Sequence, residues 1–153
     1  MEGFATNAIN VGYLGTAPAL FKRIRANITI VASVNAEGSA IIARLDSGIN
    51  NVSQLSGKKV AIPDTATVQD VLLRLALSQY GLSYGNLSSG YPVAPVAPST
   101  MPNLLNNGEF DAYIAWEPYC ALSIINSYDS VVVNSSQIWS EHRAVFLRFA
   151  KTS

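Results

Sequence analysis

The chain has 153 residues, 49% hydrophobic and only 13% charged, so it is long enough for one globular domain and unlike a disordered, highly charged chain. Ten basic residues balance ten acidic ones, which argues against a nucleic-acid-binding protein, because such proteins need an excess of positive charge. The single cysteine and the single histidine exclude an intrachain disulfide and the metal motifs that need pairs of these residues.

The first third of the chain predicts three strands and one short helix. Strands are expected over residues 9–14, 28–34 and 39–45, the second of which is rich in β-branched residues. A short helix is expected over 19–25, and one helical turn over 52–55 interrupts the polar stretch that follows the third strand.

The clearest helical pattern lies in the middle of the chain, over 67–80, after a strand expected over 58–62. The residues that recur at helical spacing and form its expected apolar face are Val68, Val71, Leu72 and Leu75. Thr67 and Asp70 resemble a capping box at its start, and Gly81 stands where a glycine ends helices.

The rest of the chain continues to alternate strands with helices. Helices are expected over 99–107, with Ser99 as the cap, and over 118–125, which begins with a proline. The expected strands are 92–97, 110–115, 131–133 and 144–149. This alternation predicts an α/β fold with a mostly parallel sheet flanked by helices.

Motifs for catalysis and for cofactor binding are missing from the sequence. It contains no GxxxxGKS/T, HExxH, GxSxG or GxGxxG pattern, so we expect no catalytic residue, no metal ligand and no cofactor. His142 lies in a polar stretch and is expected in a solvated loop. Cys120 lies on a helix expected to be half buried, where it would pack as a small hydrophobic residue.

Targeting and membrane signals are also missing. No apolar run reaches the ~20 residues of a membrane span, and runs such as 40–43 and 131–133 have the length of strands. The N-terminus lacks the charged region, apolar core and cleavage site of a signal peptide. Taken as it stands, the chain is therefore expected to be soluble and cytoplasmic.

Three loops, at 15–18, 64–67 and 116–118, each follow an expected strand and open an expected helix. Ligands of α/β sheets bind beyond the carboxyl ends of strands, where helix N-termini offer free N–H groups to small anions. The side chains that these loops would contribute are the hydroxyl groups of Thr16, Thr65 and Thr67, the indole of Trp116 and the carboxylate of Glu117. Ordinary capping and packing would explain any one of these loops, and three together favour a binding site.

Five blocks carry a family resemblance. In order, they are NVGYLGTAP at 10–18, GSAII at 38–42, LSGKKVAIP at 55–63, YGL at 80–82 and MPNLLNNGEFDAYIAWEP at 101–118. The series resembles the solute-binding proteins of ABC importers for nitrate, sulfonate, taurine and related small molecules. The blocks cover most of the chain, and their joint order is more specific than any single block.

The resemblance implies a fold of two α/β lobes joined by crossing strands, with the ligand held in the cleft between the lobes. Residues 1–36 would be part of lobe one, 37–143 would be lobe two, and 144–153 would be the strand crossing back to lobe one. Family members are about twice as long and are exported, so this chain would be a fragment of a periplasmic or extracellular, membrane-associated protein. A partial lobe would expose sheet edges and apolar surface, which favours association.

The resemblance also implies a non-catalytic protein that binds a small anionic solute and delivers it to a membrane permease. The residues on which the family's ligand contacts would fall are Gly15, Thr16, Ala17, Glu37, Gly38, Ser39, Thr65, Ala66, Thr67, Trp116 and Glu117. Glu117 fits a solute that carries an amine better than a bare anion, unless its side chain points away.

Two alternatives to an importer component remain. One is an enzyme of thiamine-pyrimidine or menaquinone-precursor biosynthesis, because some relatives with the same fold are such enzymes. The other is a sensory input module of a larger receptor. A single cysteine and a single histidine, both away from the threonine-rich loops, argue against the thiamine-type enzyme. No adjoining kinase or membrane segment supports the sensor.

Overall fold

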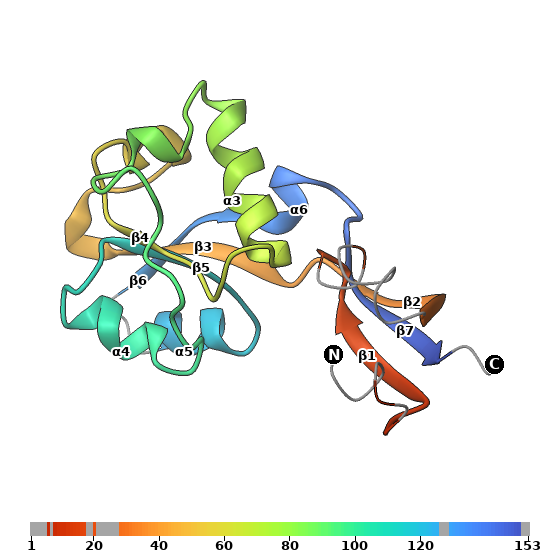
Figure 1. Ribbon diagram of the computed structural model, residues 1–153. Helices are drawn as coiled ribbons and strands as arrows, with labels where there is room; N and C mark the ends of the chain where they lie inside the picture. The colour runs from red at the N-terminus through yellow and green to blue at the C-terminus, as the bar shows by residue number, and fades with distance from the viewer. Residues whose placement is uncertain (1–5, 7, 18–19, 21–27, 126–128, 151–153) are drawn as a thin grey trace.

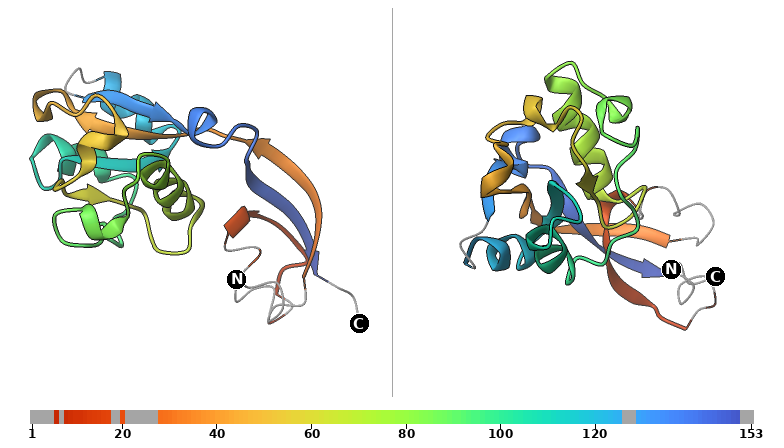
Figure 2. Two further views of the ribbon diagram at one scale, coloured as in Figure 1. Left: turned by 90° about the horizontal axis from the view of Figure 1, so that it is seen from above. Right: turned by 90° about the vertical axis from the view of Figure 1, so that its left-hand side faces the viewer.

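Two β-sheets lie side by side in the computed structural model, which describes residues 6, 8–17, 20, 28–125 and 129–150. Figures 1 and 2 show the smaller sheet standing beside the helix-covered larger one, with the chain passing between them. The arrangement places the ends of strands from both sheets at one junction.

The smaller sheet has three strands in the order β1, β7, β2. They are β1 (Val11–Gly15), β7 (Arg143–Ala150) and β2 (Ile28–Ala36), and β7 runs antiparallel to both neighbours. Register shifts between β2 and β7 mark irregular pairing, which bends strands and increases their twist. Figure 2 shows β2 and β7 as a strongly curved pair.

The larger sheet has four strands in the order β4, β5, β3, β6. They are β4 (Val60–Ala61), β5 (Ala112–Trp116), β3 (Ser39–Arg44) and β6 (Asp129–Asn134). β4 is parallel to β5, but β3 is antiparallel to both of its neighbours. The α/β class is confirmed, but the expectation of a mostly parallel sheet is wrong, because this sheet is mixed. Strand β3 follows directly from β2 and runs away from the junction, whereas β5 and β6 run back toward it.

Helices cover both faces of this sheet. In Figure 1, α3 (Val68–Gln79) and α6 (Ser135–Ile138) lie on one face, and α4 (Met101–Asn106) and α5 (Tyr119–Ile125) lie on the other. Alternation along β3 sends Ile41 into the first core and Ile42 into the second. Burial on both faces explains why β3 reads as a continuous apolar run. The short 3₁₀ helices are η1 (Leu45–Ser47), η2 (Val52–Leu55) and η3 (Tyr84–Asn86).

Most of the expected elements are confirmed within a few residues, and some need correction. The expected strand over 92–97 is only a bridge between Val93 and Ala61, because two prolines limit its pairing. Helix α4 begins after Thr100 rather than Ser99 and has no side-chain cap. The sequence analysis missed α6, and the expected helix over 19–25 falls almost wholly outside the described residues.

The buried face of α3 differs from the expected face. Leu72, Leu73, Ala76 and Leu77 are fully buried, whereas Val71 is 36% exposed. The stripe that packs on the sheet is therefore rotated around the helix from the one expected. Apolar spacing alone could not separate the two, because leucines and valines occur around most of the helix.

Apolar side chains of the three-stranded sheet are exposed. Tyr13 of β1 is 69% exposed and Val31 of β2 is 53% exposed. Among the described residues, no helix covers this sheet as α3 and α4 cover the larger one. Surfaces of this kind favour association, in line with the expectation from the sequence.

We predict that Leu73→Ala lowers the free energy of unfolding by about 2–5 kcal/mol, because it leaves a cavity in a fully buried site. The matched substitution Val71→Ala, two positions away on the same helix, costs less than about 1 kcal/mol because that side chain is partly in water. Urea denaturation followed by circular dichroism measures both. Equal losses would contradict the assigned helix face.

Candidate functional site

A pocket of about 410 Å³ lies where the two sheets meet. This volume falls within the roughly 300–1,000 Å³ of small-molecule sites. The described residues that line it are Gly15, Asn35, Glu37, Gly38, Ser39, Thr67, Val68, Gln69, Trp116 and Glu117. They come from the ends of β1, β2 and β5, the start of β3 and the start of α3, so both sheets contribute.

Seven of the residues implied by the resemblance line this pocket. They are Gly15, Glu37, Gly38, Ser39, Thr67, Trp116 and Glu117. The structure therefore gathers residues that are far apart in the sequence around one space. Their contact with a ligand stays a prediction.

Thr16 and Ala17 of the first expected loop do not line the pocket. The Thr16 hydroxyl donates a hydrogen bond to the carbonyl oxygen of Arg143, which fastens the end of β1 to the start of β7. Ala17 is buried, with 8% exposed. Both residues therefore have a structural role where β1 ends: Thr16 bonds the chain to the start of β7, and Ala17 is buried.

Thr65 and Ala66 of the second expected loop also lie outside the pocket lining, because their loop turns away before α3 begins. The Thr65 N–H donates to Asp64 Oδ1 at 2.8 Å. Ala66 adopts a left-handed φ of 57°, and its N–H donates to Asp70 Oδ2 at 2.8 Å. These contacts build the turn that positions the N-terminus of α3.

Thr67 caps α3 as expected. Its Oγ1 accepts the Asp70 N–H at 3.3 Å and donates to the Asp64 carbonyl oxygen at 2.7 Å. The hydroxyl hydrogen is therefore already engaged within the loop. Thr67 lines the pocket, but its hydroxyl does not offer a free donor.

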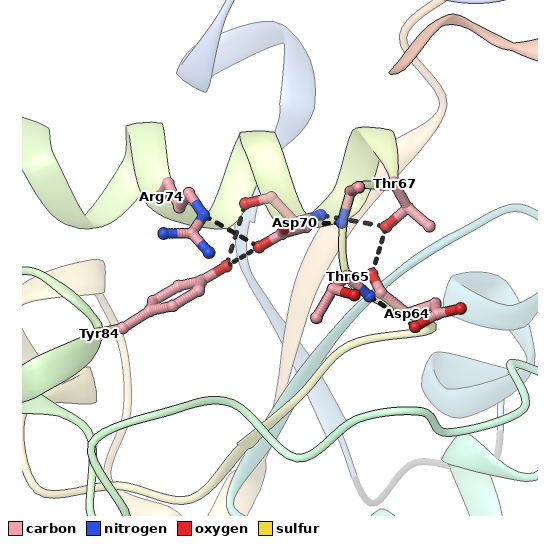
Figure 3. Close-up of polar contacts among 7 residues, drawn as sticks. Asp64, Thr65, Thr67, Asp70, Arg74 and Tyr84 are labelled. Carbon is pink, nitrogen blue, oxygen red and sulfur yellow. Dashed lines mark hydrogen bonds and ion pairs between the residues drawn. The ribbon is translucent and has the colours of Figure 1, made fainter. Parts of the chain in front are cut away.

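Asp70 holds the start of α3 in place (Figure 3). Besides the Ala66 N–H, its carboxylate accepts hydrogen bonds from the Tyr84 hydroxyl and from Arg74 Nε at 3.1 Å. Arg74 also lies over the Tyr84 ring, 4.1 Å from its centroid. Burial, with the adjacent Asp70 carboxylate, raises the pKa of Tyr84 well above its usual value, so the phenol remains a proton donor.

The sequence analysis missed Asn35, Val68 and Gln69 as pocket residues. The backbone N–H groups of Val68 and Gln69 are the first two of α3, and the described residues offer them no hydrogen-bond acceptor. Backbone donors at a helix start carry partial positive charge. Because a backbone donor has no residue signature, only the position of the helix start could have pointed to it.

A chain of buried polar residues runs from α3 through the start of β3 to α6, and its first two members line the pocket. Gln69 Nε2 donates to Ser39 Oγ at 3.0 Å, and the Ser39 N–H donates to Ser135 Oγ at 3.1 Å. All three residues are buried. Buried polar groups are costly unless they are hydrogen-bonded, so this chain fixes Gln69 and Ser39 relative to each other.

The turn that joins β2 to β3 is bonded to the second segment that crosses between the sheets. The Glu37 N–H donates to the His142 carbonyl oxygen at 3.0 Å, and Glu37 Oε1 accepts the Glu141 N–H at 3.0 Å. The Gly38 carbonyl oxygen accepts the Glu117 N–H at 3.0 Å. At the junction, the turn between β2 and β3 is thus hydrogen-bonded both to the segment before β7 and to the segment after β5.

Glu117 has a structural role as well as a place in the pocket lining. Its Oε2 accepts the Ala121 N–H at 3.0 Å and so supplies an acceptor at the start of α5. Trp116 is 38% exposed and packs edge-on against Tyr119, with ring centroids 6.1 Å apart. The indole therefore gives the pocket a partly exposed apolar surface.

The charges of the described pocket lining are both negative. Glu37 and Glu117 carry them, and no Lys, Arg or His belongs to that lining. One oxygen of each carboxylate accepts a backbone N–H, which holds both side chains in place. The same lining includes the first two residues of α3, where a helix start carries partial positive charge.

His142 is not the solvated loop residue expected from the sequence. It is only 2% exposed, and its Nδ1 lies 2.9 Å from the Trp139 carbonyl oxygen. The reversal at Glu141, with a left-handed φ of 55°, places His142 at the crossing between the sheets. Its Nε2 has no hydrogen-bond partner among the described residues, and the residue does not line the pocket.

Cys120 packs in the core, as expected. It is 1% exposed, and its Sγ lies 3.3 Å from the Ala115 carbonyl oxygen. Burial raises the pKa of its thiol to about 12. The thiolate, which is the reactive form of cysteine, is therefore suppressed at neutral pH.

The part of the chain that the structure describes has neither a cluster of metal ligands nor a membrane-spanning helix. Within it, no group of three or more His, Cys, Asp or Glu side chains could hold a metal ion. Within the same ranges, no helix has the length and apolar character needed to cross a bilayer.

Sequence comparison connects the chain with known binding proteins. The profile of the NMT1-like family matches residues 1–152. The "Putative aliphatic sulfonates-binding protein" of Escherichia coli K12 is 25% identical over 128 residues, which cover 82% of this chain and 39% of the relative. The chain thus spans well under half the length of this curated relative.

Comparison with solved structures supports the same fold. The periplasmic aliphatic sulphonate binding protein of Escherichia coli has a TM-score of 0.82 at 22% identity, covering 97% of this chain and 50% of that protein. The alkanesulfonate-binding protein of Xanthomonas axonopodis pv. citri bound to MOPS has a TM-score of 0.81 at 21% identity, covering 98% of this chain and 50% of the other. The chain therefore has the periplasmic-binding-protein-like fold over about half the length of these proteins.

We predict that Asp70→Asn lowers the free energy of unfolding by about 1–3 kcal/mol, because the amide cannot accept the Ala66, Tyr84 and Arg74 donors together. Asp64→Asn, in the exposed loop just before α3, makes the same chemical change and is the matched control; it costs less than about 1 kcal/mol. Urea denaturation measures both variants. A loss no larger in Asp70→Asn than in the control would show that Asp70 does not hold the start of α3.

Proposed function

The chain belongs to the NMT1-like family, and we propose that it is part of the solute-binding component of an ABC importer for a small anionic solute such as a sulfonate, taurine or nitrate. The observation that carries the proposal is the pocket at the junction, which is lined by the first two residues of α3 and by Trp116. The binding roles in the names of the similar proteins support it.

The anionic group of the solute would bind at the start of α3. The Val68 and Gln69 N–H groups have no acceptor among the described residues, and a helix N-terminus attracts negative charge. The Asp70 contacts hold these donors in position without a solute. The Trp116 indole would then cover the apolar part of the molecule.

The charge of the described lining favours a solute that also carries an amine. Glu37 and Glu117 would repel a bare anion such as nitrate, whereas an ammonium group would be attracted to them. Each carboxylate has one oxygen bonded to a backbone N–H and a second oxygen that can accept a further donor. Taurine, which carries a sulfonate and an amine, meets both requirements.

The mechanism we propose is closure of two lobes around the solute, followed by delivery to a membrane permease. Residues 1–36 would be part of lobe one, 37–143 lobe two, and 144–153 the strand returning to lobe one. Pocket residues from both sheets support this division. The full-length protein would be periplasmic or extracellular and membrane-associated. The similar sulphonate binding protein of Escherichia coli is periplasmic, which supports this location.

An enzyme of thiamine-pyrimidine or menaquinone-precursor biosynthesis is less well supported. The curated relative and the solved structures described above are binding proteins by name. His142 and Cys120 do not line the pocket, and both side chains are buried. We therefore propose a binding protein without catalytic activity.

We predict that Val68→Pro weakens binding of the preferred solute by about 10-fold or more, because one charge-assisted N–H donor is lost. Proline suits the first position of a helix, and Thr67 before it is already extended, with φ −90° and ψ 169°. Val68→Ala is the matched control, since it removes the same side chain and keeps the N–H. We expect it to bind within about 3-fold of the unsubstituted chain.

Calorimetric titration with taurine, methanesulfonate and nitrate provides the measurement, and taurine is expected to bind most tightly. Equal affinities of Val68→Pro and Val68→Ala would place the anion elsewhere. Failure of all three solutes to bind the unsubstituted chain would contradict the proposed anionic solute.

A further inference from the structure

Glu37 lines the pocket and also lies in the turn that carries the chain from β2 in the smaller sheet to β3 in the larger one. Its Oε1 accepts the Glu141 N–H at 3.0 Å. Its own N–H donates to the His142 carbonyl oxygen at 3.0 Å. Both the backbone and the side chain of Glu37 therefore bind the second crossing segment.

The backbone at these two segments is held in unusual conformations. Glu37, Gly38 and Glu141 have φ values of 62°, 83° and 55°. Glycine adopts such values readily, but a glutamate does so at a cost and only where neighbouring contacts hold it there. The hydrogen bonds of Glu37 to Glu141 and His142 are contacts of this kind. The turn at Glu37 and the turn at Glu141 therefore stabilise each other's backbone conformation.

A change in the angle between the sheets must alter these two segments. Among the described residues, the chain passes between the sheets from β2 into β3 and from α6 into β7. In hinge motions, a few residues at the ends of such elements absorb large changes in φ and ψ. Glu37, whose side chain ties the two passages together, is also a residue of the pocket lining.

We propose that the Glu37 carboxylate is a latch that ties the two crossing segments together and so couples the pocket to the angle between the sheets. Glu37 acts here as a positioning residue. The latch exists without a solute, and only its coupling to occupancy rests on the proposed function.

Four substitutions separate the latch from the charge of Glu37. Glu37→Ala removes both the acceptor oxygen and the charge. Glu37→Gln keeps an acceptor oxygen at the same reach and removes the charge. Glu37→Asp keeps the charge and shortens the reach by one methylene group. Glu141→Ala is the matched control, because it removes a carboxylate from the partner position and leaves the bonded backbone N–H unchanged.

The first experiment measures amide hydrogen exchange at position 141 by NMR, with no solute present. We expect exchange, corrected for the intrinsic rate, to be about 10-fold faster in Glu37→Ala and faster also in Glu37→Asp, because a charge-assisted hydrogen bond is lost. In Glu37→Gln and Glu141→Ala it stays within about 3-fold of the unsubstituted chain. Equal protection in Glu37→Ala and Glu141→Ala would overturn the latch.

The second experiment measures the distance between β1 of the smaller sheet and the loop that follows η3 beside the larger sheet, by spin labels at Tyr13→Cys and Tyr91→Cys, both exposed positions. The native Cys120 stays in place because it is buried. We expect a broader distance distribution in Glu37→Ala than in Glu37→Gln or Glu141→Ala, and a narrower one when taurine binds the unsubstituted chain. Unchanged width in Glu37→Ala, or no change when calorimetry shows taurine bound, would overturn the coupling.

These experiments also separate the latch from the proposed function. Exchange at position 141 decides the latch without any solute. If none of the solutes binds while Glu37→Ala still loses protection, the proposed function fails and the latch stands. If Glu37→Ala does not fold, as judged by circular dichroism, the comparison of Glu37→Asp with Glu37→Gln decides the question.

Discussion

The two hydrogen-bonded reversals at the junction are the constraint on which the rest of the structure depends. Glu37 and Gly38 turn the chain from one sheet into the other, and Glu141 turns it back. Because the Glu117 N–H bonds to the Gly38 carbonyl oxygen, the same junction fixes the end of β5. The pocket exists because these reversals bring strand ends from both sheets to one place.

The second requirement is a rigid start for α3. Asp70 gathers donors from the preceding loop, from η3 and from its own helix, and so fixes where the helix begins. Val68 and Gln69, whose N–H groups are the first two of this helix, line the pocket, and the described lining contains no basic side chain. In the proposed function these backbone donors would attract the anion, while backbone N–H groups hold the two carboxylates of the lining.

Hydrophobic periodicity predicted the α/β class and helix α3, and the residue pattern at its start predicted the Thr67 cap. Of the seven expected residues that line the pocket, loop position indicated Gly15, Thr67, Trp116 and Glu117, and the family resemblance alone implied Glu37, Gly38 and Ser39. The sequence could not predict the direction of β3, which depends on long-range pairing. It missed His142 as a buried residue, because burial there results from the contact between the two crossing segments. Val68 was missed because its contribution is a backbone N–H, which any residue except proline would supply.

The measurement that tests the account most directly is a titration of the isotope-labelled chain with taurine, followed by backbone amide NMR shifts. We expect saturable changes that are largest at Val68 and Gln69, with further changes at Gly38 and Trp116. Absence of saturable changes, or changes confined to the exposed strands of the smaller sheet, would contradict the assignment of the junction pocket as the solute site.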